Sequence, residues 1–244
     1  MPIDAVIFDV DGTLLRYDEN LMFDKFADCL GTDRRSVQRL IARFLAAGTG
    51  LGIPELWPPT PDAAPAHWES VAHAFARHAQ AAPTAIPALV QTIQGFGEGY
   101  APFPDTLDCL RQMNGLALAV LTNNHVEHMP ETLARCGIDP AIFRVILACY
   151  RHGFAKPDPA AYLTVARALG VDPARCAFVD DTPGHVHAAH ELGMTAWLID
   201  RYDRYQSYPG LRIGTLAEFA EKIAPIAPGP LCATDQGRET GSRA

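Results

Sequence analysis

The sequence predicts an α/β fold, namely a doubly wound parallel sheet with a small all-helical domain inserted after the first strand. Stretches with apolar residues at helical spacing alternate with short apolar runs, and this alternation favours a parallel sheet covered on both faces. About a hundred residues separate the first two runs, where a βα connection needs only a dozen or more, so an insertion is expected there. The five runs that are typical of buried parallel strands are 3–8, 116–121, 145–149, 176–179 and 195–199.

The inserted segment has helical periodicity of its own. Four apolar stripes begin at Phe23, Val37, Trp68 and Leu89, and they can close on one another as a small bundle. Glycine and proline are concentrated over residues 48–66, which predicts an irregular loop between two pairs of helices.

The ends of the insertion coincide with segments that break helices and strands. We expect hinges near residues 14–19 and near residues 98–104, where the run GEGYAPFP concentrates glycine and proline. The predicted α/β core therefore comprises residues 1–16 and 100–224, and the helical domain comprises residues 17–99.

Two further helices are predicted in the core, and a tail follows it. Their apolar stripes are Val126, Met129 and Leu133, and Tyr162, Val165, Ala166 and Leu169. Residues 225–244 have no periodicity and are rich in proline, glycine and small polar residues, so we expect this tail to be disordered.

Composition excludes several classes of protein. The net charge is −8, which disfavours a nucleic-acid partner, and 48% hydrophobic residues suffice for a sizeable core. The apolar runs are far shorter than the roughly 20 residues that cross a bilayer, so no membrane segment is expected. The N-terminal MPIDAVIFDVDG lacks the basic leader of a signal peptide, and the six cysteines form no CxxC pair, so we expect reduced core thiols and a cytoplasmic protein.

Polar side chains follow the predicted strands where each strand ends. In an open parallel sheet these ends form the edge where ligands bind. Carboxylates bind a hard divalent cation such as Mg²⁺, while lysine and threonine hold anionic oxygens, so the set predicts a phosphate ligand. The residues concerned are Asp9 and Asp11, Thr122 and Asn123, Lys156, and Asp180 and Asp181.

Four motifs at these positions resemble those of the haloacid dehalogenase (HAD) superfamily. They read FDVDGT at 8–13, LTNN at 121–124, KPD at 156–158 and VDDTPGHV at 179–186. The resemblance covers about residues 1–200, and a helical insertion after the first motif resembles the family's mobile cap. It implies a Mg²⁺-dependent phosphomonoester hydrolase that acts on a small phosphorylated metabolite.

The first motif carries the reaction in this interpretation. Asp9 is the nucleophile, whose carboxylate forms an aspartyl-phosphate and so splits one difficult displacement into two. Asp11 protonates the departing alkoxide and then deprotonates the hydrolytic water. By resemblance, the metal is held by the Asp9 side chain, the Asp11 backbone carbonyl and Asp181.

The second and third motifs are expected to bind the phosphoryl group. Thr122 and Asn123 donate hydrogen bonds to phosphoryl oxygens, and Lys156 offsets the negative charge on that group and on Asp9. Thr122 is also suited to capping the next helix, which does not exclude this role.

Other residues are expected to support the site from behind. Gly12 permits the turn after the first strand, and Thr13 fixes the turn by hydrogen bonding. Asp180 orients Lys156 or a metal-bound water. His185 stands where related motifs usually have asparagine, and we expect it to tie a metal-binding carboxylate to its loop.

Three functions other than phosphatase remain open at this point. Haloacid dehalogenation is disfavoured because that branch lacks an acid at the position of Asp11. A phosphomutase of the β-phosphoglucomutase type and a non-catalytic, receiver-like phosphoacceptor or metabolite sensor share much of the motif set, although a receiver needs no large cap. His125, Trp57 and Trp68 are weaker candidates for substrate contact, and neither the substrate nor the oligomeric state can be deduced.

Overall fold

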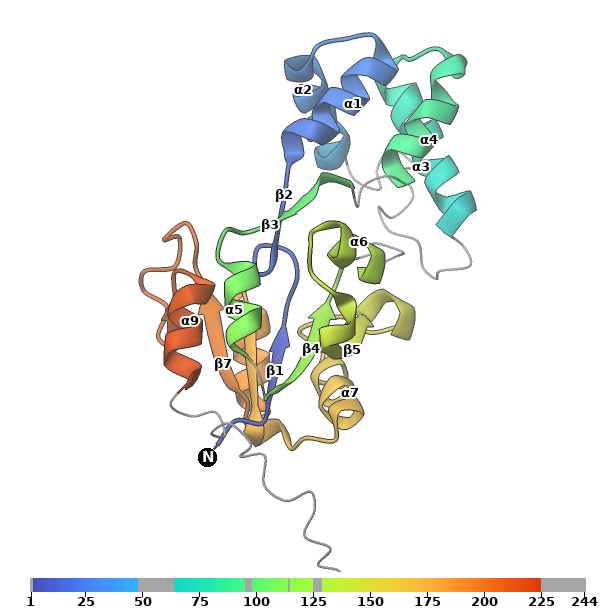
Figure 1. Ribbon diagram of the computed structural model, residues 1–244. Coiled ribbons are helices and arrows are strands. Elements are labelled where there is room, and N and C mark those ends of the chain that lie inside the picture. Colours follow the sequence, from blue (N-terminus) through green and yellow to red (C-terminus); the bar gives the residue numbers. More distant parts are fainter. Residues whose placement is uncertain (1, 48–63, 95–97, 114, 125–128, 225–244) are drawn as a thin grey trace, which may run out of the picture.

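A six-stranded parallel sheet forms the centre of the core (Figure 1). The computed structural model describes residues 2–47, 64–94, 98–113, 115–124 and 129–224. The strands lie in the order β5-β4-β1-β6-β7-β8, which confirms the predicted doubly wound α/β fold. They are β1 (Ala5–Phe8), β4 (Ala117–Thr122), β5 (Phe143–Ala148), β6 (Cys176–Asp180), β7 (Thr195–Ile199) and β8 (Leu211–Ile213). Of these six strands, only the three-residue edge strand β8 was not predicted.

Helices cover both faces of this sheet. On β1, Val6 and Phe8 face one hydrophobic cluster with α5, α6 and α9, while Ala5 and Ile7 face another with α7 and α8. All four side chains are fully buried, because a central parallel strand has no solvent-facing side. The helices are α5 (Thr106–Gln112), α6 (Met129–Arg135), α7 (Pro159–Leu169), α8 (Pro183–Glu191) and α9 (Leu216–Ile223).

The inserted segment forms a helical bundle with a hydrophobic core of its own. Val37 and Leu89 are fully buried in it, and the rings of Phe26 and Phe75 meet edge to face at 5.1 Å. The helices are α1 (Glu19–Leu30), α2 (Arg34–Ala47), α3 (Ala64–Ala79) and α4 (Ile86–Gln94). Much of the predicted loop 48–66, with Trp57, lies outside the described residues, as do His125 and the tail 225–244.

The bundle and the core are joined by a two-stranded antiparallel ribbon (Figure 1). It consists of β2 (Leu15–Tyr17) and β3 (Tyr100–Pro102), with Tyr17 paired to Tyr100. The ribbon occupies the two predicted hinges, where sequence analysis expected only irregular chain. Three residues per strand are too few to give an alternating pattern, which explains the omission.

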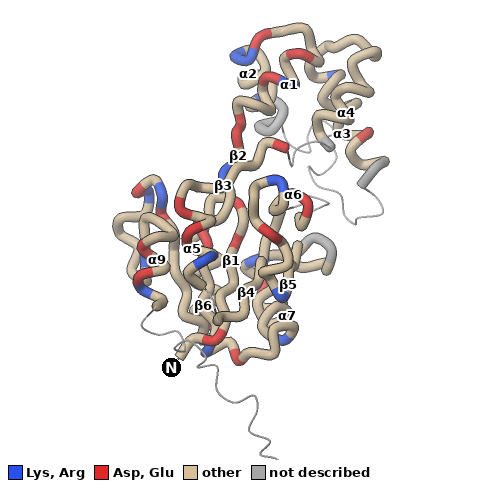
Figure 2. The backbone as a smooth tube through the Cα atoms, in the orientation of Figure 1, with Lys and Arg blue, Asp and Glu red and all other residues tan. Residues whose placement is uncertain are grey.

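The carboxyl ends of β1 and β4 point toward the helical bundle in Figure 1. Acidic positions gather on this side of the core in Figure 2, whereas the opposite end of the sheet carries the N-terminus.

Short 3₁₀ turns complete the fold; they are Pro83–Ala85, Pro140–Ile142, Cys149–His152 and Pro173–Arg175. Among the described helices, none is both long and apolar enough to cross a membrane.

Candidate active site

The strand order brings three of the four motifs together. Because β1 lies between β4 and β6, the residues that follow these strands share one edge of the sheet. Asp9 and Asp11 follow β1, Thr122 ends β4 and Asp180 ends β6. The remaining motif, the third along the chain, contains Lys156 and comes from the segment between β5 and α7.

Lys156 joins two of these strands through a buried ion-pair network. Its Nζ lies 2.6 Å from Asp9 Oδ1 and 2.6 Å from Asp180 Oδ2, and all three side chains are at most 7% exposed. Burial alone would lower the pKa of Lys156, but the two carboxylates outweigh it and raise that pKa above its ordinary value. The ammonium therefore stays charged beside Asp9.

Asp180 pairs with Lys156, and further hydrogen bonds hold the Asp180 carboxylate in place. Its Oδ1 accepts a hydrogen bond from the Thr182 backbone at 2.8 Å, and His185 Nδ1 lies 3.1 Å from both carboxylate oxygens. Although burial would raise the pKa of Asp180, Lys156 and His185 lower it. His185 therefore contacts Asp180, which forms an acidic cluster with Asp9 and Asp181, and its tie between a metal-binding carboxylate and its loop stays a prediction.

Gly12 allows Asp181 to approach the turn after β1. Gly12 has a φ of +73°, and a Cβ placed on it would lie 2.1 Å from Asp181 Oδ2. A side chain at position 12 would therefore be both strained and in collision with the carboxylate. This confirms that the turn needs glycine, for a steric reason beyond backbone freedom.

Asp9, Asp180 and Asp181 form an acidic cluster suited to a hard cation. One carboxylate oxygen from each lies within 4.8 Å of the others. Burial raises the pKa of Asp9 well above its ordinary value, and burial together with the neighbouring Asp180 raises the pKa of Asp181. A bound divalent cation would relieve both penalties. Since the donors are oxygens and Gly12 leaves room for Asp181, the residues fit Mg²⁺.

Asp11 lies apart from this cluster in a different environment. Tyr100 Oη donates to its Oδ1 at 2.5 Å, and Asn124 Nδ2 donates to its Oδ2 at 2.8 Å. Burial raises the pKa of Asp11, while these two hydrogen bonds oppose the rise. A carboxyl group with a raised pKa is suited to proton transfer.

Thr122 and Asn123 are held at the end of β4 in different ways. Thr122 is fully buried and its Oγ1 accepts from the backbone N–H of Asn124 at 3.0 Å. The Asn123 side chain pairs with the backbone of Lys156, donating to its carbonyl at 2.9 Å and accepting from its N–H at 2.8 Å. Its side-chain amide therefore positions the lysine loop, and donation from Asn123 to phosphoryl oxygens stays a prediction.

Thr13 does not fix the turn in the way predicted. Its Oγ1 is buried and has no hydrogen-bond partner among the described residues. Instead, Arg201 Nη2 donates to the Thr13 carbonyl at 2.7 Å, and Arg201 Nε donates to the Gly12 carbonyl at 3.3 Å. The guanidinium also contacts both Asp105 oxygens at 3.1 Å and lies over the Phe103 ring. Arg201 thus ties the first motif to the chain that leaves the ribbon.

Sequence analysis missed Tyr100, Asn124 and Arg201. Asn124 lies inside the LTNN motif, so its position gave a usable signal. Tyr100 and Arg201 are single polar residues outside any motif, and their partners lie 89 and 188 residues away in the chain. No local pattern could have identified them.

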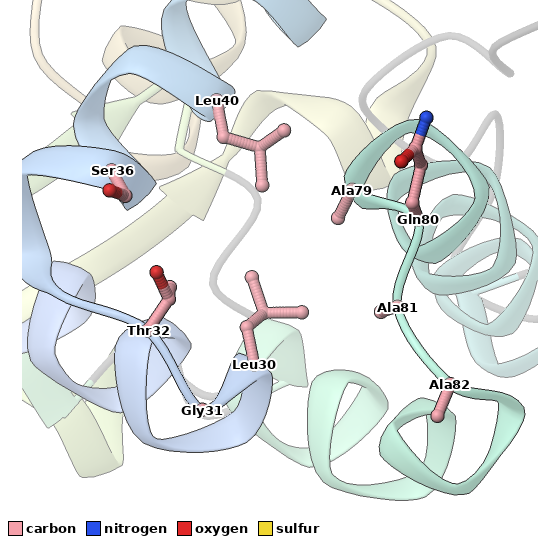
Figure 3. Close-up of a pocket in the computed structure, with 9 residues that line it drawn as sticks. All are labelled: Leu30, Gly31, Thr32, Ser36, Leu40, Ala79, Gln80, Ala81 and Ala82. Atoms are coloured by element: carbon pink, nitrogen blue, oxygen red, sulfur yellow. The ribbon is translucent and has the colours of Figure 1, made fainter.

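A pocket of about 460 Å³ that is open to solvent lies between α1, α2 and the end of α3, away from these residues. Residues 30–32, Ser36, Leu40 and 79–82 line it, and no predicted site residue is among them (Figure 3). Trp68 packs against the hydrophobic core of the bundle. The candidate site is therefore the cluster of charged side chains at the sheet edge, and this pocket is separate from it.

Known proteins share both the sequence pattern and the fold. Residues 3–193 match the sequence profile of the haloacid dehalogenase-like hydrolases. The chain is 31% identical over 204 residues to a phosphatase of Mycobacterium tuberculosis, covering 82% of this chain and 89% of that protein. The fold resembles that of a HAD phosphatase from Thermococcus onnurineus, with a TM-score of 0.61 and 22% identity over 91% of this chain and 98% of that one. It also resembles that of the L-2-haloacid dehalogenase from Xanthobacter autotrophicus, with a TM-score of 0.62 and 18% identity over 92% and 100% of the two chains.

Proposed function

This chain belongs to the haloacid dehalogenase-like hydrolases, and within that family we propose that it is a phosphatase acting on a small phosphorylated metabolite. The phosphatase of Mycobacterium tuberculosis, which aligns over most of both chains, supports the phosphatase activity. The family also contains dehalogenases, so the choice between the two reactions depends on the site itself.

Asp11 is the observation that carries this choice. A halide leaves carbon as a stable anion and needs no proton, whereas the alkoxide released from a phosphate ester does. Asp11 offers a carboxyl group two residues after the nucleophile, and burial raises its pKa above the ordinary value. A carboxyl group with a raised pKa can protonate the leaving oxygen of a phosphate ester, whereas halide displacement needs no proton donor.

The reaction then proceeds in two displacements at phosphorus. An Asp9 oxygen forms a bond to phosphorus while the bond to the leaving oxygen breaks, and the Asp11 proton passes to that oxygen to give the free alcohol. Water next attacks phosphorus and gives its proton to Asp11. The bond to Asp9 breaks, so inorganic phosphate leaves and both carboxyl groups return to their starting states.

Lys156 is placed to lower the charge on the reacting group. Its Nζ lies 2.6 Å from the proposed nucleophile and is held there by Asp180. Asp9, Asp181 and the Asp11 carbonyl would hold Mg²⁺, which when bound screens the repulsion between Asp9 and the phosphoryl oxygens. Thr122 would donate to the same oxygens from the end of β4.

We propose that the bundle formed by residues 17–99 acts as a cap over this edge of the sheet. The carboxyl ends of the central strands face it (Figure 1). A cap that closes over the site excludes water and contacts the leaving group, so it would set which metabolite is accepted.

Paired assays test the proposal. The purified chain is incubated with a panel of sugar phosphates, nucleotides, phosphoglycolate and amino-acid phosphates, and separately with 2-haloacids, with Mg²⁺ or with EDTA. We expect release of inorganic phosphate that depends on Mg²⁺ and no release of halide. Halide release without phosphate release would overturn the phosphatase proposal, and a rearranged sugar phosphate without free phosphate would indicate a mutase.

A further inference from the structure

The Asp11 carboxylate accepts hydrogen bonds from two side chains, one on the ribbon and one in the core. Tyr100 lies on β3, the strand by which the chain returns from the bundle, and Asn124 follows β4 in the core. The tyrosine hydroxyl binds one oxygen of Asp11 at 2.5 Å and the asparagine amide binds the other at 2.8 Å. With one donor on each oxygen, the plane of the carboxyl group is fixed.

The two donors also contact each other. Asn124 Nδ2 donates to Tyr100 Oη at 2.6 Å, so the three side chains form a closed triangle of hydrogen bonds. A tyrosine hydroxyl is protonated at neutral pH, so Tyr100 acts as the donor to Asp11. In such a network each hydrogen bond orients the others.

Tyr100 is itself positioned by the ribbon between bundle and core. Its ring meets that of Tyr17, its partner across the ribbon, edge to face at 5.1 Å. Its carbonyl accepts from Cys136 Sγ at 3.3 Å. The hydroxyl therefore reaches the acid from the segment that connects the two parts of the chain.

We propose that Tyr100 and Asn124 are positioning residues for Asp11, and that they direct its carboxyl group toward the leaving-group oxygen. This inference rests on the phosphatase function proposed above. As the proton moves from Asp11 to the leaving oxygen, negative charge develops on the carboxylate. Both donors are already in place to stabilise that charge, so no reorganisation is needed at that moment.

The proposal predicts an effect that depends on the leaving group. A phenolate leaves without a proton, whereas an alkoxide needs one, so only alkyl phosphates should require a well-oriented acid. In single-turnover measurements with Mg²⁺, we expect Tyr100→Phe to slow alcohol release from an alkyl phosphate by about 10-fold or more. We expect phenol release from an aryl phosphate to slow by less than about 3-fold.

Two further variants separate positioning from a general structural effect. Tyr17→Phe removes a hydroxyl from the paired strand but keeps the ring that meets Tyr100, and it should leave the ratio of aryl to alkyl rates unchanged. In a background carrying Asp11→Asn, the Tyr100→Phe substitution should cost alkyl turnover little, because the group that it positions is gone. If Tyr100→Phe does not fold, Asn124→Ala tests the same carboxyl group from the core and should change the same ratio.

Equal losses on both substrates for Tyr100→Phe and Asn124→Ala would overturn the proposal, as would an undiminished effect in the Asp11→Asn background. Either result would leave the phosphatase function intact, provided that the wild type releases phosphate. A wild type that releases no phosphate from either substrate would instead refute the proposed function, and with it this inference.

Discussion

Replacing Lys156 with methionine should strongly destabilise the protein. Methionine keeps the length of the side chain but removes an ammonium that lies 2.6 Å from both Asp9 and Asp180. The side chains of the three residues are 1%, 7% and 0% exposed, so the change leaves two buried carboxylates without this partner. Removing one member of a buried ion pair costs about 3–5 kcal/mol. For a protein of this size, that corresponds to a fall in Tm of about 6–20 °C at pH 7.

The loss of stability in Lys156→Met should depend on pH, because Asp9 and Asp180 titrate. Without Lys156, the folded-state pKa values of Asp9 and Asp180 rise, so the folded variant binds more protons than the folded wild type as the pH falls. Each such proton contributes up to about 1.4 kcal/mol per pH unit. The difference in free energy of unfolding between wild type and variant should therefore narrow from pH 7 to pH 5.

Urea unfolding in EDTA at pH 5, 6 and 7 measures both effects. Lys222→Met is a matched control, because Lys222 is 44% exposed and lies 3.4 Å from Glu218, an exposed pair whose loss should cost under about 1 kcal/mol. A loss below about 1 kcal/mol for Lys156→Met at pH 7 would refute the reasoning. A difference that widens toward pH 5 would refute it equally.

Three further substitutions or deletions test separate parts of the site. Gly12→Ala should weaken Mg²⁺ binding at least about 10-fold by calorimetry, because the added Cβ would lie 2.1 Å from Asp181 Oδ2. Unchanged Mg²⁺ affinity would mean that metal binding does not need the close approach of Asp181 to Gly12. Asp11→Asn should slow single-turnover hydrolysis of alkyl phosphates by about 10²–10⁴-fold and of aryl phosphates much less; equal losses would exclude it as the general acid. Replacing residues 19–98 with a short Gly/Ser linker should preserve Mg²⁺ binding and abolish discrimination among small phosphates; a folded core with the intact protein's substrate ranking would refute the cap.

The parts of the site that the sequence predicts are those tied to strand ends. Asp9, Asp180 and Thr122 each follow or close an apolar run, and parallel strands bring such positions to one edge. Lys156 lies outside any strand, yet its motif places it before α7, where Asp158 caps the helix by accepting from Ala160 N–H at 2.9 Å. Local patterns therefore suffice for these residues.

Side-chain direction and long-range partners are what the sequence does not reveal. The side-chain amide of Asn123 pairs with the backbone of Lys156, a contact that is set by how two loops meet and that no local pattern predicts. Thr13 was expected to secure the turn, which Arg201 secures from a loop 188 residues further along. Such pairings depend on tertiary packing, which composition and periodicity do not encode.

Trapping the phosphoryl group on Asp9 tests the central claim most directly. The Asp11→Asn variant should accept phosphate from an aryl ester but hydrolyse the intermediate slowly, because the base that activates water is gone. Rapid acid quench with ³²P-labelled aryl phosphate, followed by peptide mapping, should therefore give label on the peptide that contains Asp9. Asp9→Asn should give none. Stoichiometric release of the phenol by Asp11→Asn without labelled protein, or label that persists in Asp9→Asn, would contradict the account.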